Sequence, residues 1–205
     1  ITGLRALKSG KVILDGEDVT GKTPAKITEK GLSYVPEERM KDGMIREFTI
    51  TENLILREHH KYPFAEHGFL RIAYINEHSD RLIDQYRIKT PSRSTLAKNL
   101  SGGNIQKVLL ARELSRSPRA IVAAQPTRGL DIGASEYVHG QLLQQRELGT
   151  AILLISEDLD EIMAIADRIA VIYEGEIMGI VNRGEATVEE LGLMMAGVRQ
   201  EQKSA

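Results

Sequence analysis

Two short segments that are apolar throughout constrain the fold of this chain most strongly. They are Ala120–Ala124 and Ala151–Ile155, and each precedes a segment with helical composition, 134–148 and 159–166 respectively. Strands that are apolar on both faces are typical of a parallel sheet covered by helices, because the crossover helices of βαβ units lie on the faces of the sheet. Leu32–Val35, which ends before Pro36, is predicted to be a further strand.

The rest of the pattern predicts antiparallel strands and a helical insertion. Strands are expected at Lys11–Asp15 and, as a hairpin around Glu174 and Gly175, at Ile169–Tyr173 and Glu176–Val181. Helices are expected at Pro24–Lys30, at 51–56, at 76–86 and from Ser101 to Ser117. The helical segments between 49 and 98 form an inserted subdomain in this interpretation, within which 59–75 has no assignable pattern.

Composition excludes several classes of function. The formal net charge of −2 argues against a broad surface for nucleic acid, which needs an excess of Lys and Arg. The absence of cysteine excludes disulfides and thiolate metal sites. No apolar run reaches the roughly 18 residues that span a bilayer. The histidines lack the spacing of metal ligands, so no metal site is predicted and the histidines are expected at surface or loop positions.

Ser101, Gly102 and Gly103 stand directly before a predicted helix. Glycines allow backbone N–H groups to approach an anion, a serine hydroxyl can donate a hydrogen bond, and a helix N-terminus carries partial positive charge. The triplet therefore suits a phosphate group. Taken alone, however, it favours a simple N-cap for the helix that follows.

The context of this triplet resembles a known family. Leu100-Ser-Gly-Gly-Asn104 opens a helix, an apolar strand follows, and Gln125-Pro-Thr-Arg-Gly-Leu-Asp131 comes next. In order and spacing these resemble the signature helix, Walker B strand and D-loop of ATP-binding-cassette (ABC) proteins. Ser33–Arg39 looks like the family's Q-loop, with Glu37 at the position of the glutamine, and Ile155–Leu159 like its switch-histidine loop. Glu37 and the Asn104 that ends the signature are similar to the second cassette of fused two-cassette importers for simple sugars or nucleosides.

The resemblance implies a P-loop NTPase-like α/β fold. We expect a parallel sheet with flanking helices, an antiparallel β edge and an inserted α-helical subdomain, with the N-terminal strands and the Walker A loop lying upstream of Ile1. The implied domains are a partial ATPase core at 1–48, a helical signature subdomain at 49–101, further ATPase core at 102–198, and a tail at 199–205.

One segment matches the phosphate-loop pattern without its context. Gly16-Glu-Asp-Val-Thr-Gly21-Lys22-Thr23 fits G-x-x-x-x-G-K-[ST] and follows a predicted strand. Glu17 and Asp18 would place two carboxylates in a cradle for polyphosphate, where like charges repel. The resemblance also places this segment in the antiparallel region. We therefore interpret the match as a coincidence and the segment as an exposed turn.

The catalytic positions implied by the resemblance are substituted. Walker B ends in Ala124 and Gln125 where the family has an Asp that helps to hold Mg²⁺ and a Glu that activates water. An alanine cannot bind metal-bound water, and an amide is a very poor base at neutral pH. Glu157 stands at the position of the switch histidine. These substitutions predict that the site on this half's own residues is degenerate.

The leading functional hypothesis follows from the family's head-to-tail pairing of cassettes. Ser101, Gly102, Gly103 and Asn104 would serve ATP and Mg²⁺ bound by a partner cassette, and Asp131 would couple the two sites. The expected partners are an N-terminal cassette of the same polypeptide, membrane permease subunits that face segment 39–56 and, indirectly, an extracellular solute-binding protein; no nucleic acid is expected. The expected location is the cytoplasmic face of the cell membrane.

Three other readings stay open. A fully active ABC ATPase requires a glutamate or an intact phosphate loop. Non-transport ABC proteins of DNA repair insert long coiled coils between Q-loop and signature, whereas the segment from Glu38 to Lys98 is short and lacks sustained heptads. The near-neutral charge disfavours an ABC protein that acts on ribosomes.

Overall fold

A computed structural model describes residues 1–199 of the chain, which divides into two compact units. The first unit comprises residues 1–155 and the second begins at Ser156. This division falls within segment 102–198, which was predicted as one part of the ATPase core. The domain limits at 48/49 and 101/102 stay predictions. The predicted tail at 199–205 lies outside the described residues from position 200 onward.

The first unit contains a three-stranded parallel sheet in the order β3-β6-β7. Its strands are Leu32–Val35 (β3), Ala120–Ala124 (β6) and Ala151–Ile155 (β7), with the bounds that the sequence predicts. Leu32 pairs with Ala120, which in turn pairs with Ala151. The prediction of a parallel sheet is confirmed.

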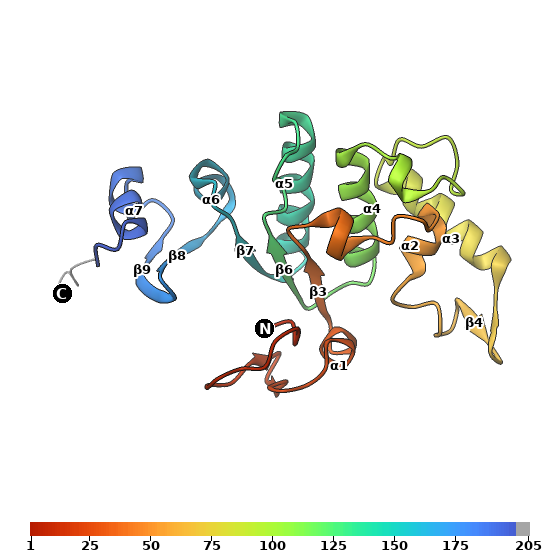
Figure 1. Ribbon diagram of the computed structural model, residues 1–205, viewed down its shortest axis with the longest axis horizontal. Coiled ribbons are helices and arrows are strands. Elements are labelled where there is room, and N and C mark those ends of the chain that lie inside the picture. Colours follow the sequence, from red (N-terminus) through yellow and green to blue (C-terminus); the bar gives the residue numbers. More distant parts are fainter. Residues whose placement is uncertain (200–205) are drawn as a thin grey trace. The chain divides into compact units, whose positions relative to one another are not determined.

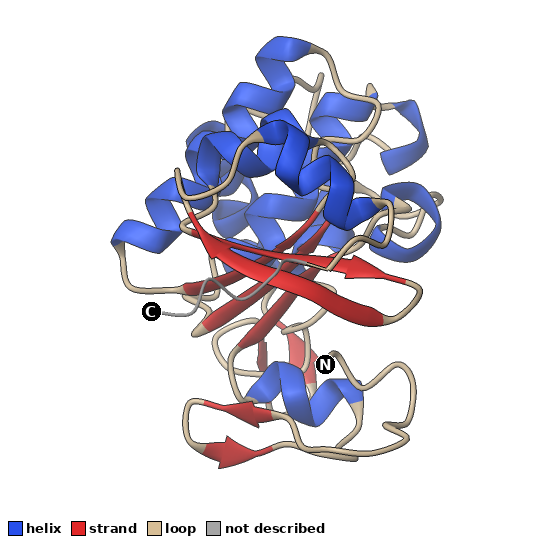
Figure 2. Ribbon diagram, turned by 90° about the vertical axis from the view of Figure 1, so that its left-hand side faces the viewer, coloured by secondary structure: helices blue, strands red, loops and turns tan. Residues whose placement is uncertain are grey.

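Two long helices lie alongside this sheet (Figure 1; Figure 2). Helix α4 (Gly102–Leu114) precedes β6, and helix α5 (Ile132–Glu147) connects β6 to β7. The order of the three strands along the chain is also their order across the sheet. Right-handed crossovers therefore put both connecting helices on the same face. Helix α4 is buried along most of its length because it packs against β3 and against helices of the insertion.

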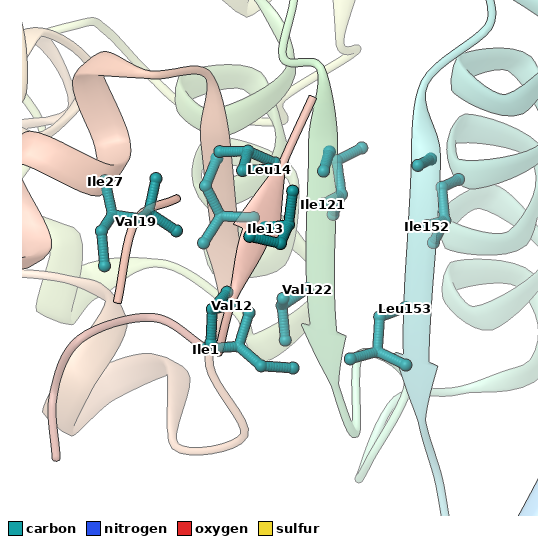
Figure 3. A pocket seen from close by; sticks show the side chains of 13 residues that line it. Ile1, Val12, Ile13, Leu14, Val19, Ile27, Ile121, Val122, Ile152 and Leu153 are labelled. Carbon is teal, nitrogen blue, oxygen red and sulfur yellow. The ribbon is translucent and has the colours of Figure 1, made fainter. Parts of the chain in front are cut away.

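The opposite face of the sheet is partly open. Leu153 and Ile155 of β7 are 43% and 47% exposed, so the prediction that helices cover both faces is wrong for this strand within residues 1–199. A groove of about 230 Å³ lies here, between the sheet and the N-terminal segment (Figure 3). Its lining is apolar, as Val12, Val122 and Leu153 illustrate, and therefore offers no side-chain partner for phosphate.

The N-terminal segment forms a small hairpin instead of the five-residue strand expected at Lys11–Asp15. Only Ile13–Leu14 (β1) and Glu17–Asp18 (β2) pair, in antiparallel fashion, and helix α1 (Pro24–Glu29) follows as predicted. The hairpin and α1 are joined to the sheet by a cluster of buried side chains, namely Val19, Ile27, Leu32 and Val122.

The insertion is helical, as predicted, with boundaries that differ. It contains helices α2 (Ile50–Ile55) and α3 (Ile72–Gln85) and a 3₁₀ turn η2 (Ala97–Asn99), and a π-helical turn η1 (Arg39–Gly43) precedes it. Helix α2 begins with a capping box between Thr49 and Glu52. The segment without an assignable pattern contains a short hairpin of β4 (Ala65–Glu66) and β5 (Phe69–Leu70).

A buried ion-pair network joins the insertion to helix α4. The carboxylate of Glu113, which is fully buried, accepts hydrogen bonds from Arg57 Nε at 2.8 Å and from Arg112 Nε at 2.9 Å. Arg112 is itself only 3% exposed, and burial lowers its pKa. Buried charges of this kind need partners because desolvation of an isolated ion costs several kcal/mol.

His78 lies on helix α3 and is buried, so the prediction of a surface or loop position is wrong for this residue. Its ring is buried against Phe64, with ring centroids 4.9 Å apart. Arg81 Nη2 donates to His78 Nδ1 at 3.0 Å, which leaves the proton of the neutral ring on Nε2. Burial lowers the pKa of His78, the Arg81 charge lowers it further, and Glu58 opposes both effects.

The first unit is therefore expected to become less stable as the pH is lowered. The unfolded chain binds the proton of His78 near its ordinary pKa of 6.5, whereas the folded chain binds it only at lower pH. The free energy of unfolding in urea should decrease as the pH falls below about 6.5, and His78→Gln should flatten this dependence. The same substitution at the exposed hairpin residue His67 is the control, and an equal flattening there would contradict the assignment.

The second unit is a hairpin packed against helices. Strands β8 (Arg168–Tyr173) and β9 (Glu176–Asn182) form the predicted antiparallel pair, and α6 (Leu159–Ile165) precedes them. Helix α7 (Val188–Met195), which the sequence analysis did not predict, covers the hairpin with Leu191 and Met194. No helix within residues 1–199 combines the length and the hydropathy of a membrane span.

Candidate functional site

Ser101 occupies the N-cap position of helix α4, but its side chain does not cap the helix. A serine at this position ordinarily accepts a hydrogen bond from a backbone N–H of the first turn. Here Ser101 Oγ instead accepts from Asn104 Nδ2 at 2.9 Å. The simple N-cap reading of the Ser-Gly-Gly triplet is therefore wrong in its hydrogen bonding, and the exposed hydroxyl keeps its proton for another acceptor.

The two glycines of the signature loop, Ser101–Asn104, lie against the predicted Q-loop and D-loop regions. A Cβ on Gly102 would lie 3.6 Å from Arg39 Nη2, and a Cβ on Gly103 would lie 3.4 Å from the Cβ of Ala134 at the start of α5. Small residues here therefore let the N-terminus of α4 approach α5 closely. The fold brings the signature loop beside the segment that follows β6.

Arg39 connects these segments, and the sequence analysis did not single it out as a site residue. Its Nη2 donates to the backbone carbonyl of Gly129 at 3.4 Å, and the same atom lies next to Gly102. Burial lowers the pKa of Arg39, with neighbouring Glu38 acting in the opposite direction. A guanidinium remains charged under these conditions. Arg39 therefore adds positive charge between the signature loop and the predicted D-loop.

Glu37, at the predicted Q-loop position, forms an ion pair with Arg128. The pair joins the end of β3 to the segment after β6, and both side chains are largely exposed. A free carboxylate would repel a polyphosphate, and the neighbouring guanidinium reduces this repulsion. The contact joins the predicted Q-loop to the predicted D-loop segment, and the nucleotide-binding role of Glu37 stays a prediction.

The end of strand β6 carries the two predicted Walker B positions. Ala124 is the last strand residue, and Gln125 has a left-handed backbone with a φ of 47°. The N–H of Gln125 donates to the carbonyl of Ile155 at 2.7 Å. Gln106 of helix α4, which is buried, donates from Nε2 to the carbonyl of Pro126 at 2.8 Å. The signature helix therefore fixes the backbone that leaves the Walker B strand.

Asp131, the predicted coupling residue of the D-loop, is the N-cap of helix α5. Its carboxylate accepts a hydrogen bond from the N–H of Ala134 at 2.9 Å. The side chain is exposed, and the next residue, Ile132, is 80% exposed. Asp131 therefore has a structural role within the chain, and its exposed position leaves the proposed coupling role a prediction.

Glu157, at the predicted switch position, belongs to the second unit. The following residue, Asp158, caps helix α6 by accepting hydrogen bonds from the N–H groups of Asp160 and Glu161. These acidic residues thus begin helix α6, which lies within the segment predicted as helical at 159–166.

The segment that matches the phosphate-loop pattern has a different backbone. Gly16 is in the turn of the β1–β2 hairpin, Glu17 and Asp18 form β2, and Thr23 is the N-cap of α1. A phosphate loop joins a parallel strand to a helix so that consecutive N–H groups surround the phosphates. An antiparallel hairpin with two exposed carboxylates does not provide this arrangement.

The residues at the end of β6 do not fit Mg²⁺. Ala124 has no side-chain oxygen, and hard divalent cations require oxygen ligands, chiefly carboxylates. Among residues 1–199, no three His, Asp or Glu side chains gather as metal ligands would. The signature loop does fit a phosphate, because an exposed hydroxyl, a helix N-terminus and Arg39 lie together.

Comparison with known proteins agrees with this geometry. Residues 1–128 match the family model described as ABC transporter. The chain is 46% identical to the guanosine import ATP-binding protein NupO of Bacillus subtilis over 98% of the chain and 40% of that protein. It is 45% identical to the nucleoside import ATP-binding protein NupA of Lactococcus lactis, over 96% of the chain and 39% of that protein. The chain therefore spans about two fifths of the length of these relatives.

Solved structures show the same fold. An ATP-binding cassette of an ABC transporter superposes with a TM-score of 0.73 at 22% identity, covering 96% of this chain and 77% of the other. A dimeric ATP-binding cassette bound to ADP and Pi gives a TM-score of 0.71 at 23% identity, over 89% and 77% of the two chains. The predicted P-loop NTPase-like fold is confirmed. The chain belongs to the ABC transporter family and forms part of an ATP-binding domain.

Proposed function

We propose that this chain is part of the ATP-binding subunit of an importer for nucleosides or simple sugars, and that its signature loop serves ATP held by another cassette. The solute class rests on the relatives, which are named for the import of guanosine, nucleosides and ribose. The role of the signature loop rests on one observation. Ser101 stands at the N-cap of α4, exposed, with a hydroxyl that is not used to cap the helix.

The chemistry of this loop is the binding of a phosphate group. The Ser101 hydroxyl donates to a phosphate oxygen, and the first backbone N–H groups of α4 point along the helix axis toward the same place. The positive end of the helix dipole and the Arg39 guanidinium favour the negative charge. These groups orient a nucleotide whose remaining contacts come from the partner cassette.

The site on this half's own residues is catalytically degenerate in this proposal. Ala124 offers no oxygen for Mg²⁺, and the amide of Gln125 is a very poor base, although it can orient a water molecule. Glu157 adds an anion where a cationic or neutral donor would assist a phosphate. The phosphate loop of this half is proposed to lie upstream of Ile1. The outer edge of β7, which pairs with no strand in residues 1–199, offers a position for one further strand.

The proposed partners are a cassette of the same polypeptide and membrane permease subunits. The remaining length of the relatives leaves room for another cassette. A groove of about 340 Å³ between α1, η1, α2 and α4 supports permease docking, because it adjoins the predicted permease-facing segment 39–56. An extracellular solute-binding protein would act indirectly through the permease. This arrangement places the chain at the cytoplasmic face of the membrane.

Photolabelling can test the role of the signature loop. The probe is an ATP analogue with an aryl azide on its γ-phosphate, added to the complete polypeptide with its permease subunits. We expect the label within Ser101–Asn104, because the γ-phosphate would lie against this loop. Labelling should disappear when the phosphate-loop lysine of the partner cassette is replaced, since that loop holds the nucleotide. A label on Gly16–Thr23, or one that survives this replacement, would contradict the proposal.

A fully active ATPase is the competing function. It predicts that the complete polypeptide retains turnover when the partner cassette is disabled. An ABC protein without a transport role predicts that no permease co-purifies with it. Both measurements use the same preparation, and the substituted Walker B positions Ala124 and Gln125 favour the proposed function over the first alternative.

A further inference from the structure

The side chain of Asn104 bridges two parts of the chain next to the signature loop. Its Oδ1 accepts a hydrogen bond from the backbone N–H of Lys89 at 2.8 Å, and its Nδ2 donates to Ser101 Oγ at 2.9 Å. Asn104 is partly buried, whereas Ser101 is exposed. The amide thus connects the segment after helix α3 to the hydroxyl group at the start of α4.

The backbone of Lys89 determines which way this amide points. An N–H group can only donate, so the atom of Asn104 that faces Lys89 must be the oxygen. The amide nitrogen then faces Ser101, and the serine oxygen is the acceptor in that contact. Because the amide nitrogen donates to the serine oxygen, the proton of the Ser101 hydroxyl is directed away from Asn104.

We propose that Asn104 is the positioning residue that makes the Ser101 hydroxyl a hydrogen-bond donor toward the phosphate bound in trans. This inference rests on the proposed function of the signature loop. Asn104 itself does not touch the nucleotide in this proposal. It acts through Ser101 by occupying the acceptor side of the hydroxyl, so that the donor side faces outward.

The segment that holds Asn104 is itself anchored on two helices. Tyr137 of α5 donates from its hydroxyl to the carbonyl of Tyr86 at 3.0 Å, and Lys107 of α4 donates from Nζ to the carbonyl of Arg87 at 3.0 Å. The Lys107 ammonium also lies 4.7 Å from the ring centroid of Tyr137. Burial raises the pKa of Tyr137 to about 12, so its hydroxyl remains a donor. Lys89 therefore presents its N–H from a fixed position.

Asn104→Asp tests the direction of the hydrogen bond with almost no change of shape. The new carboxylate can still accept from Lys89, but its second oxygen would also be an acceptor, and the Ser101 proton would turn inward to it. We expect kcat for ATP turnover by the complete transporter to fall by about tenfold or more, as when a preorganised donor is lost. Asn104→Leu, which removes the donor without adding charge, should cause a smaller fall in kcat. Asn104→Gln, which keeps an amide, should retain part of the activity.

A double-mutant cycle with Ser101→Ala separates positioning from a general effect on structure. If Asn104 acts through the hydroxyl, Asn104→Asp should have little further effect once the hydroxyl is gone. The charge control is Asn99→Asp, which adds the same charge at an exposed position close to the loop and should change kcat by less than about twofold. The thermal midpoint of each variant shows that the fold is retained.

The outcomes distinguish this inference from the proposed function. Three results would each overturn the positioning role. They are full additivity of Asn104→Asp and Ser101→Ala, unchanged turnover in Asn104→Asp, and unchanged turnover in Ser101→Ala. In all these cases, loss of turnover in Ser101→Arg would leave the proposed function standing. Unchanged turnover in Ser101→Arg would instead refute the proposed function, and with it the positioning role.

Discussion

Replacing Ser101 with arginine is expected to reduce ATP-dependent uptake by the complete transporter by at least about a hundredfold, the scale of losing a donor to the reacting group. The substitution removes the hydroxyl and places a long side chain at the start of α4, beside Gly102 and Arg39. The space that a phosphate needs would then be filled. If the loop serves a nucleotide held by another cassette, as proposed, the loss should appear as a failure of the paired cassettes to close. Uptake of labelled solute into vesicles, with nucleotide hydrolysis measured in parallel, checks this result.

Two control variants make the result specific. Gln125→Ala should leave uptake within about twofold of the unchanged protein, because an amide at this position contributes little as a base. Ser115→Arg applies the same change to the exposed C-cap of the same helix, where a cation interacts favourably with the helix dipole. An equal loss in Ser101→Arg and Gln125→Ala would show that this half has its own active site.

Replacing Glu113 with glutamine is expected to destabilise the chain by about 3–5 kcal/mol, the cost of breaking a buried ion pair. The substitution preserves the size of the side chain but removes its charge, so Arg112, which is 3% exposed, would remain as a buried cation. Arg57 would also lose its partner, although it is partly exposed and can be solvated. Urea unfolding followed by far-UV circular dichroism measures the change in free energy.

The matched control is an exposed ion pair in the same insertion. Arg93 donates to Asp80 at 2.8 Å, with both side chains well exposed. Asp80→Asn should cost less than about 1 kcal/mol, because water screens the charges and solvates the arginine that remains. If Glu113→Gln cost no more than Asp80→Asn, the buried network would not be the connection between the insertion and α4 that its geometry indicates.

The parallel strands could be predicted because their signal is local. Strands β6 and β7 are short apolar runs, and β3 is a short segment that ends before Pro36; burial on both faces of a parallel sheet favours such apolar runs. The prediction that helices cover both faces is wrong for β7, whose Leu153 and Ile155 are exposed. An apolar sequence indicates that a segment can be buried, but not which other segment covers it.

Other elements were predicted only in part or not at all. Strands β1, β2, β4 and β5 contain two residues each, which is too short for a periodic pattern. Helix α7 begins with a capping box at Thr187, a signal in the sequence that the analysis did not use. The burial of His78 depends on Phe64, which only the folded insertion brings beside it.

The sequence by itself determined the family, because its motifs are statements about residue type and spacing. The substitutions at Ala124, Gln125 and Glu157, and the place of Ser101 in a signature loop, could be predicted without coordinates. Only the tertiary structure decided what these residues contact. It placed Arg39 against Gly129, across 90 positions of the chain, and gave the Ser101 hydroxyl Asn104 as its donor in place of the backbone. Such partners arise from the packing of α4 against the sheet and the insertion, because packing sets the distance and direction that a hydrogen bond requires.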